Sequence, residues 1–253
     1  MPRASRYLRE GYTYHLTHRC HDRRFLLRFS RERNAYREWL RVGTQRYGVA
    51  VYGYCITSTH THVIVHVDDR EAVSRLMQLA AGAVAQMINV RKGHEGSVWE
   101  HPYQCTMVED GQHLLNCLRY VDMNMVRAGV VEHPQKWRWC GYDELTGQRK
   151  RYRIIDVDRL LQSLDLPDAA SLQRLHVEGI SSQIERRDLS RQDYWTEAVA
   201  IGSKAFVAQA EEEHTHRRQF LEYSVSQEGQ PSAWAIKEEP SSYSVDSGRK
   251  SAL

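Results

Sequence analysis

The stretch Cys55-Ile-Thr-Ser-Thr-His-Thr-His-Val-Ile-Val-His-Val67 alternates in side-chain character and predicts a β-strand. Alternate residues of a strand point to the same face, so His60 and His62 would share a face and could bind one metal ion. The three valines that follow would point the other way, into a hydrophobic core. The plainer interpretation is a half-buried strand whose polar face carries histidines, and this stretch alone leaves both open.

The segments around this strand predict an α+β fold. The first of them, Gly11 to Cys20, alternates and is rich in Tyr and Thr; it would place His15 and Arg19 on one face and His18 on the other. We predict strands at 11–20, 49–57 and 61–67, an extended segment at 98–108, and helices at 31–47, 68–90 and 110–129. This order predicts a ferredoxin-like or RRM-like antiparallel sheet with helices on one face.

The composition changes after Gly147, which divides the chain into three predicted parts. The first domain spans 1–147 and carries the sheet. A helical C-terminal extension spans 148–227, with helices expected at 156–164, 171–184, 194–210 and 211–223. A disordered tail is expected over 228–253, because this segment is rich in Ser, Glu, Gln and Lys and has little apolar periodicity.

The positive charge of the chain is concentrated at its start. The first fifty residues contain twelve Arg, no Lys and four acidic residues, whereas the whole chain of 253 residues has a net charge of +3. Arginine binds phosphate in a planar, bidentate way, so this segment favours nucleic acid over the alternative of a solvated Arg-rich surface. The candidate DNA contacts are Arg3, Arg6, His18, Arg19, Arg23 and Arg24.

The sequence predicts a cytoplasmic protein. No apolar run approaches the ~20 residues that span a bilayer, and the first residues lack the apolar core of a signal peptide. The five cysteines are scattered singly, which is typical of reduced thiols rather than of a disulfide framework or a zinc finger.

A tyrosine and an asparagine in the third predicted helix add to the histidines. Tyr120 and Asn124 are four residues apart and therefore lie on one helical face. If that face meets His60 and His62, the site would combine ligands for a divalent cation with a phenol that can attack a phosphodiester. The alternative for Tyr120 is an ordinary half-buried helix residue, and spacing alone cannot show the pairing.

Five stretches in the first 147 residues carry a resemblance to a known family. They are Met1-Pro-Arg-Ala-Ser-Arg6, Tyr54-Cys-Ile-Thr-Ser-Thr-His-Thr-His62, Val98-Trp-Glu100 with Val108-Glu-Asp110, Leu118-Arg-Tyr-Val-Asp-Met-Asn-Met-Val-Arg-Ala-Gly-Val-Val131, and Trp137-Arg-Trp-Cys-Gly-Tyr142. Together they resemble the REP-associated tyrosine transposases, the IS200-like branch of the HUH single-strand transposases with a single catalytic tyrosine.

The resemblance implies a role for each site residue. His60 and His62 match the two metal-ligating histidines, and Asn124 matches the third ligand, for Mg²⁺ or Mn²⁺. Tyr120 matches the nucleophile that takes the 5′-phosphate of cleaved single-stranded DNA and leaves a 3′-hydroxyl. The domain over 1–147 would then be an HUH-type catalytic domain. Its DNA would be a palindromic REP-type hairpin with a single-stranded tag, and the protein would be associated with the nucleoid in the cytoplasm.

The sequence also departs from the family pattern. Ser58-Thr59 replaces Pro-Asn, Thr61 replaces a bulky apolar residue, Asp122 replaces His and Met125 replaces Pro. These changes keep open a hairpin DNA-binding protein with weak or no cleavage. A third hypothesis, a metal-dependent phosphodiesterase that acts on RNA, stays open because the predicted sheet resembles an RNA-recognition scaffold. The sequence leaves open whether the protein acts alone or as a homodimer.

Overall fold

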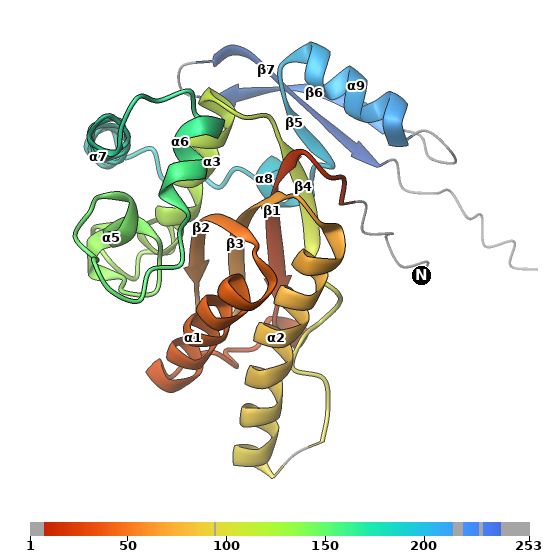
Figure 1. Ribbon diagram of the computed structural model, residues 1–253, viewed down its shortest axis with the longest axis vertical. Helices are drawn as coiled ribbons and strands as arrows, with labels where there is room; N and C mark the ends of the chain where they lie inside the picture. The colour runs from red at the N-terminus through yellow and green to blue at the C-terminus, as the bar shows by residue number, and fades with distance from the viewer. Residues whose placement is uncertain (1–7, 94, 215–219, 228–229, 239–253) are drawn as a thin grey trace, which may run out of the picture.

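The structure, a computed structural model, describes residues 8–93, 95–214, 220–227 and 230–238. One mixed sheet runs through it, and helices pack against the sheet (Figure 1). The predicted α+β class is therefore confirmed. In the described part of the chain, no helix has the length and apolar character needed to cross a membrane.

The strands and helices follow in chain order. The strands are β1 (Tyr12–Arg19), β2 (Ala50–Ile56), β3 (His60–Val67), β4 (Gln104–Val108), β5 (Ala200–Gly202), β6 (Phe220–Gln227) and β7 (Gln230–Glu238). The α-helices are α1 (Ser30–Tyr47), α2 (Arg70–Lys92), α3 (Gln112–Asp122), α4 (Asn124–Arg127), α5 (Tyr142–Leu145), α6 (Val157–Ser163), α7 (Ala169–Glu185), α8 (Tyr194–Glu197) and α9 (Lys204–His214). Two 3₁₀ turns, η1 (His21–Arg23) and η2 (Pro134–Lys136), complete the set.

The first four strands form the predicted antiparallel sheet in the ferredoxin-like order β2-β3-β1-β4. In its register, Thr17 of β1 lies opposite His62 of β3, and His15 lies opposite Ile64. Directly opposed residues of paired strands share a face, so His15, Thr17 and His62 all point to the same side of the sheet.

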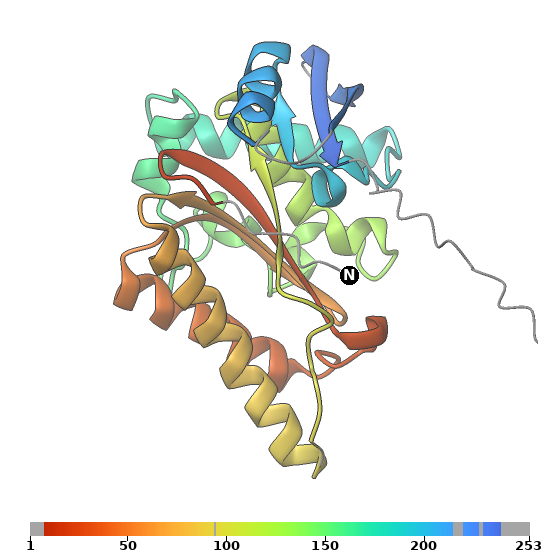
Figure 2. The ribbon, with the colours of Figure 1, turned by 90° about the vertical axis from the view of Figure 1, so that its right-hand side faces the viewer.

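Helices cover both faces of the sheet, whereas the sequence predicted helices on one. Thr61 donates a hydrogen bond to the hydroxyl of Tyr36 in α1, while its neighbour His62 contacts Asn124 of α4 on the opposite face. Figure 2 shows α1 and α2 on one side of the sheet and α3 with α4 on the other. Gly53 of β2 permits this second layer, because a Cβ there would lie 2.8 Å from Leu118 of α3.

The C-terminal half extends the same sheet. Strand β5 pairs in parallel with β4 through Ala200 and Met107, and β7 and β6 follow outward in antiparallel order. The expected helical extension over 148–227 is therefore wrong at β5 and β6, and β7 is a strand inside the expected tail. Residues 239–253 of that expected tail lie outside the described residues, and the boundary at 147 stays a prediction.

The predicted helix over 194–210 is correct at α8 and α9 but wrong at β5, and the predicted helix over 211–223 is wrong at β6. The error at β5 has a tertiary reason. The segment around Ala200 and Ile201 pairs with the free edge of β4, where Met107 N donates to Val199 O at 2.8 Å and Glu109 N donates to Ile201 O at 3.0 Å. Backbone groups at a sheet edge need such partners, and three residues are too few to show a strand period in the sequence.

Candidate functional site

His60 and His62 project from β3 onto the face covered by α3 and α4. Their rings lie 4.7 Å apart between centroids and are nearly perpendicular. The side chain between them, Thr61, points the other way, where its hydroxyl donates to Tyr36 at 3.1 Å. The buried hydroxyl of Thr61 therefore has a hydrogen-bond partner in the core. The alternation of the strand holds both imidazoles on one side.

Tyr120 and Asn124 reach the same place from the helical layer. Met123 separates α3 from α4 but keeps a right-handed helical conformation, with φ −72° and ψ −2°, so the two residues stay on one helical face. The amide nitrogen of Asn124 lies 3.0 Å from Nε2 of His62, and the ring of Tyr120 lies 6.1 Å from that of His62. All four side chains line one hollow of about 310 Å³.

A hydrogen-bond chain runs behind His62. Its Nδ1 lies 2.8 Å from Nε2 of His15, and Nδ1 of His15 lies 2.7 Å from the backbone carbonyl oxygen of Trp195. The two imidazoles are stacked, with ring centroids 5.0 Å apart. These hydrogen bonds connect the first half of the protein to α8, because Trp195 belongs to that C-terminal helix.

Burial keeps the imidazoles neutral. It lowers the pKa of His60 to about 4, with Arg19 acting in the same direction, and it lowers the pKa of His15 to about 4. Burial also lowers the pKa of His62 well below its ordinary value. Neutral imidazoles present lone pairs at pH 7, which is the state that a metal ion requires.

Tyr120 is held as a neutral phenol next to a cation. Burial raises the pKa of Tyr120, and the positive charge of Arg127 acts against this rise. The Arg127 guanidinium lies over the tyrosine ring, 4.0 Å from its centroid, and donates to the Tyr120 backbone oxygen at 2.7 Å. The ring is only 6% exposed and packs against Trp195. An attacking phenol would therefore lose its proton beside a fixed positive charge.

The donor set of His60, His62 and Asn124 fits a divalent cation that accepts nitrogen and oxygen ligands. A carboxamide binds a cation through its oxygen, whereas here the nitrogen of Asn124 faces His62, so coordination would require the amide to turn over. Among the described residues, no three His, Cys, Asp or Glu side chains are placed to hold a metal ion. A three-ligand site in this part of the chain thus depends on Asn124.

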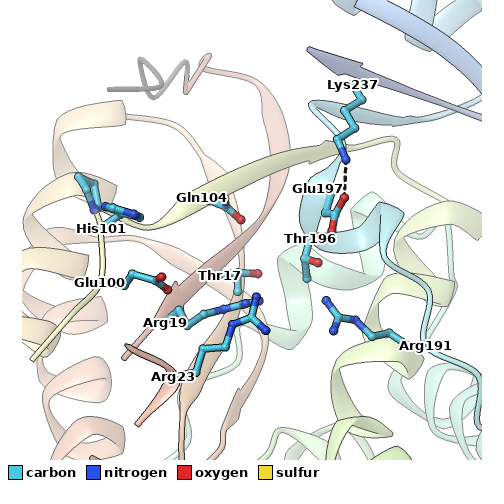
Figure 3. Close-up of a pocket in the computed structure, with 11 residues that line it drawn as sticks. Thr17, Arg19, Arg23, Glu100, His101, Gln104, Arg191, Thr196, Glu197 and Lys237 are labelled. Carbon is cyan, nitrogen blue, oxygen red and sulfur yellow. Dashed lines mark hydrogen bonds and ion pairs between the residues drawn. The ribbon is translucent and has the colours of Figure 1, made fainter. Parts of the chain in front are cut away.

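Arginines line a second hollow that adjoins the first. Arg19 of β1, Arg23 of η1 and Arg191, which precedes α8, line both hollows, and the second has a volume of about 390 Å³. Figure 3 shows the three guanidinium groups pointing into the same space. The lining also holds Glu100 and the ion pair between Glu197 and Lys237, so the hollow keeps a net positive charge.

The structure separates the remaining candidate DNA contacts. His18 is buried, stacks on Trp99 at 4.2 Å and faces away from His62, so it lies apart from the histidine pair and its role as a DNA contact stays a prediction. Successive residues of a strand point to opposite faces, so His18 lies on the face opposite His15. Arg24 is exposed but lines neither of these two hollows, and Arg3 and Arg6 lie outside the described residues.

Asp122, which replaces the family histidine, points away from the site. Its carboxylate lies 2.9 Å from Nε2 of His176 in α7, and both side chains are buried. A position two residues after Tyr120 is about 200° around a helix, which places it on the other side. Asp122 therefore ties α3 to α7 and has no contact with the imidazoles of β3.

Sequence reasoning missed Trp195, Arg191 and Arg127. Trp195 and Arg191 come from a C-terminal segment that long-range contacts with β1 and β4 bring to the site. Arg127 could have been found, because it lies seven residues after Tyr120, which is two helical turns and hence the same face.

Comparison with known proteins finds one family model that is similar to the part of the chain carrying the site residues. Residues 9–124 match the model of the family described as "Transposase IS200 like", and this range contains His60, His62, Tyr120 and Asn124. No curated protein matches the chain.

Two solved structures resemble the fold. One is a REP-associated tyrosine transposase bound to a REP hairpin, at 16% identity and a TM-score of 0.47, covering 58% of this chain and 87% of that one. The other is a candidate transposase from Deinococcus radiodurans R1, at 14% identity and a TM-score of 0.33, covering 51% of this chain and 98% of that one. At these scores neither likeness adds to the family match. The family match therefore shows that residues 9–124, a little under half of the chain, are similar to the IS200-like transposases.

Proposed function

We propose that the protein is a metal-dependent endonuclease and strand transferase that cleaves and rejoins single-stranded DNA at palindromic hairpins. The observation that carries the proposal is the meeting of Tyr120, His60, His62 and Asn124 in one hollow, with Arg127 over the phenol. A phenol beside potential cation ligands and a fixed positive charge is suited to attack a phosphodiester.

In the proposed reaction, Tyr120 is the nucleophile. Its phenolic oxygen bonds to phosphorus, the bond from phosphorus to the 3′-oxygen breaks, and the phenolic proton passes to solvent while the 3′-oxygen takes one up. The products are a 5′-phosphotyrosine and a free 3′-hydroxyl. Attack by the 3′-hydroxyl of a second strand reverses these steps and joins that strand to the 5′-phosphate. Arg127 stabilises the phenolate in both directions.

His60, His62 and Asn124 would hold Mg²⁺ or Mn²⁺ in this proposal. When bound, such an ion would supply Lewis-acid stabilisation of the charge on the phosphate oxygens. The protein's own part is to keep both imidazoles deprotonated by burial and to hold them on one strand face. The rigid sheet fixes the spacing of the two rings before DNA arrives.

The arginine-lined hollow gives the single strand a path to Tyr120. Arg19, Arg23 and Arg191 line the space next to the histidines. Arg191 also pairs with Asp193, whereas the guanidinium groups of Arg19 and Arg23 can each contact a phosphate with two parallel hydrogen bonds. Arg19 and Arg23 form no ion pair within the described residues, so their charge is available to a DNA backbone. We propose that the single-stranded DNA next to the scissile phosphate lies in this hollow of about 390 Å³.

A second candidate function is hairpin binding with weak or no cleavage. The observation in its favour is the burial of Tyr120, which is 6% exposed and has a raised pKa. A nucleophile in that state reacts only if DNA binding opens the space beside Trp195.

Incubation of the protein with a single-stranded hairpin DNA and Mn²⁺ separates the functions. The proposal predicts a 3′-hydroxyl product and a protein–DNA species that survives denaturation, both absent with EDTA and with Tyr120→Phe. Binding of the hairpin by the Phe variant should stay near the wild-type level. Hairpin affinity without any product would favour the binding protein, and cleavage of the matching RNA in preference to DNA would favour an RNA phosphodiesterase.

A further inference from the structure

We infer that His15 is a positioning residue which, held by the backbone carbonyl of Trp195, fixes the tautomer and ring orientation of His62. The inference deepens the proposed function, because it says what makes Nε2 of His62 available as a ligand atom. It also gives the C-terminal half a part in the site, since Trp195 lies outside the stretch that matches the transposase family.

The direction of each hydrogen bond in the chain follows from its first acceptor. A carbonyl oxygen can only accept, so Nδ1 of His15 carries the proton that bonds Trp195 O at 2.7 Å. A neutral imidazole has one N–H, which makes Nε2 of His15 an acceptor. That atom lies 2.8 Å from Nδ1 of His62, which must therefore donate. His62 is left with an unprotonated Nε2 that faces Asn124 at 3.0 Å.

No competing contact sets the tautomer as strongly. The hydroxyl of Thr17 lies 3.4 Å from the same Nδ1 atom, near the limit for a hydrogen bond, and a hydroxyl can donate or accept. His15 and His62 are each 1% exposed, so solvent does not offer alternative partners. Within this hydrogen-bond chain, the carbonyl oxygen of Trp195 can only accept, whereas each imidazole nitrogen can donate or accept.

The fold fixes both ends of this hydrogen-bond chain, His62 and Trp195. The β1–β3 register sets Thr17 opposite His62, and His15 follows two residues away on the same face. At the other end, Thr106 of β4 donates to Ala198 O at 2.7 Å, directly after α8, and Met107 pairs with Ala200 of β5. The carbonyl of Trp195 is therefore tied to the central sheet and not to a free loop.

The consequence is a preformed ligand atom. Without His15, the proton of His62 could move to Nε2, and that tautomer cannot bind a metal ion through the nitrogen beside Asn124. Loss of a residue that orients a ligating histidine typically weakens metal binding by about 10–100-fold. The effect belongs to the ligand geometry, so it should appear without any DNA or cleavage.

Long-range ¹H–¹⁵N NMR of the full-length protein without metal tests the inference directly. The wild type should show His62 protonated at Nδ1 and unprotonated at Nε2. His15→Leu removes the acceptor and has a side chain of similar size, so His62 should show mixed tautomers. Calorimetry should then show Mn²⁺ binding that is weaker by about 10–100-fold. His15→Gln restores one donor and one acceptor and should recover part of both signals, which a purely structural role would not produce.

Thr17→Val is the matched control, because it removes only the long contact to His62. It should leave the tautomer as in the wild type. A wild-type protein with His62 protonated at Nε2 would overturn the inference without any variant, even if His15→Leu fails to fold. An unchanged His62 tautomer in folded His15→Leu would overturn it too. The expected tautomer in a protein that makes no DNA adduct would leave the inference standing and reject the proposed function.

Discussion

The guanidinium of Arg127 lies 4.0 Å from the ring centroid of Tyr120, so a fixed positive charge lies beside the phenol that meets the histidine pair. Burial raises the pKa of Tyr120 and Arg127 lowers it. The arginine therefore favours the phenolate, the form that would attack phosphorus in the proposed reaction. In the proposed reaction, this contact offsets part of the rise in the pKa of Tyr120 that burial causes.

Arg127→Gln is expected to slow adduct formation and to move its pH dependence upward. Removing the positive charge raises the pKa of Tyr120 further, so the rising limb of the rate profile should shift to higher pH by on the order of one unit. Single-turnover rates at a series of pH values measure this. Arg187→Gln, an exposed arginine outside the hollows, is the control, and an unshifted profile in Arg127→Gln would remove the proposed electrostatic role.

Asn124 should control cation affinity. Asn124→Ala removes the third donor and is expected to weaken Mn²⁺ binding, whereas Asn124→Asp adds a negative charge and is expected to strengthen it. Calorimetry without DNA measures both, with Asn116→Ala in α3 as a comparison outside this hollow. Equal Mn²⁺ affinity in the wild type and Asn124→Ala would contradict the ligand assignment.

Arg191 should bind DNA through phosphate. Arg191→Ala is expected to weaken binding of a single-stranded hairpin and to lower the slope of log affinity against log salt by about 0.7. Fluorescence anisotropy at several salt concentrations measures both quantities. Arg187→Ala, four residues away and exposed, should leave the slope unchanged; equal losses in the two variants would indicate a general charge effect.

The hydrogen bond from Thr61 to Tyr36 should stabilise the fold through pairing in the core. Thr61→Val leaves the buried Tyr36 hydroxyl without this donor and is expected to lower the free energy of unfolding by about 1–3 kcal/mol. The double variant with Tyr36→Phe removes both polar groups and should recover much of that loss. Urea denaturation of the four proteins measures the coupling, and strictly additive effects would show that the pair does not interact.

The sequence predicted the first half of the fold because its patterns are local. The strand containing His60 and His62 alternates over eight residues, and α1 ends at Tyr47 before Gly48, whose φ of 67° suits a helix cap. Tyr120 and Asn124 were placed on one face by helical spacing, and the structure brings that face to the histidines.

The C-terminal half escaped sequence reasoning because its structure depends on partners far along the chain. The three-residue strand β5 exists only as a pair with β4 and β7, and its short apolar run is equally compatible with a helix. For the same reason the sequence could not show that Trp195 reaches His15, which lies 180 residues earlier.

Mass spectrometry of the protein after reaction with a hairpin DNA and Mn²⁺ tests the central claim most directly. The account predicts a nucleotide attached through its 5′-phosphate to the peptide that contains Tyr120, and to no other tyrosine. Cleaved DNA without such a peptide, or an adduct on a different residue, would contradict it.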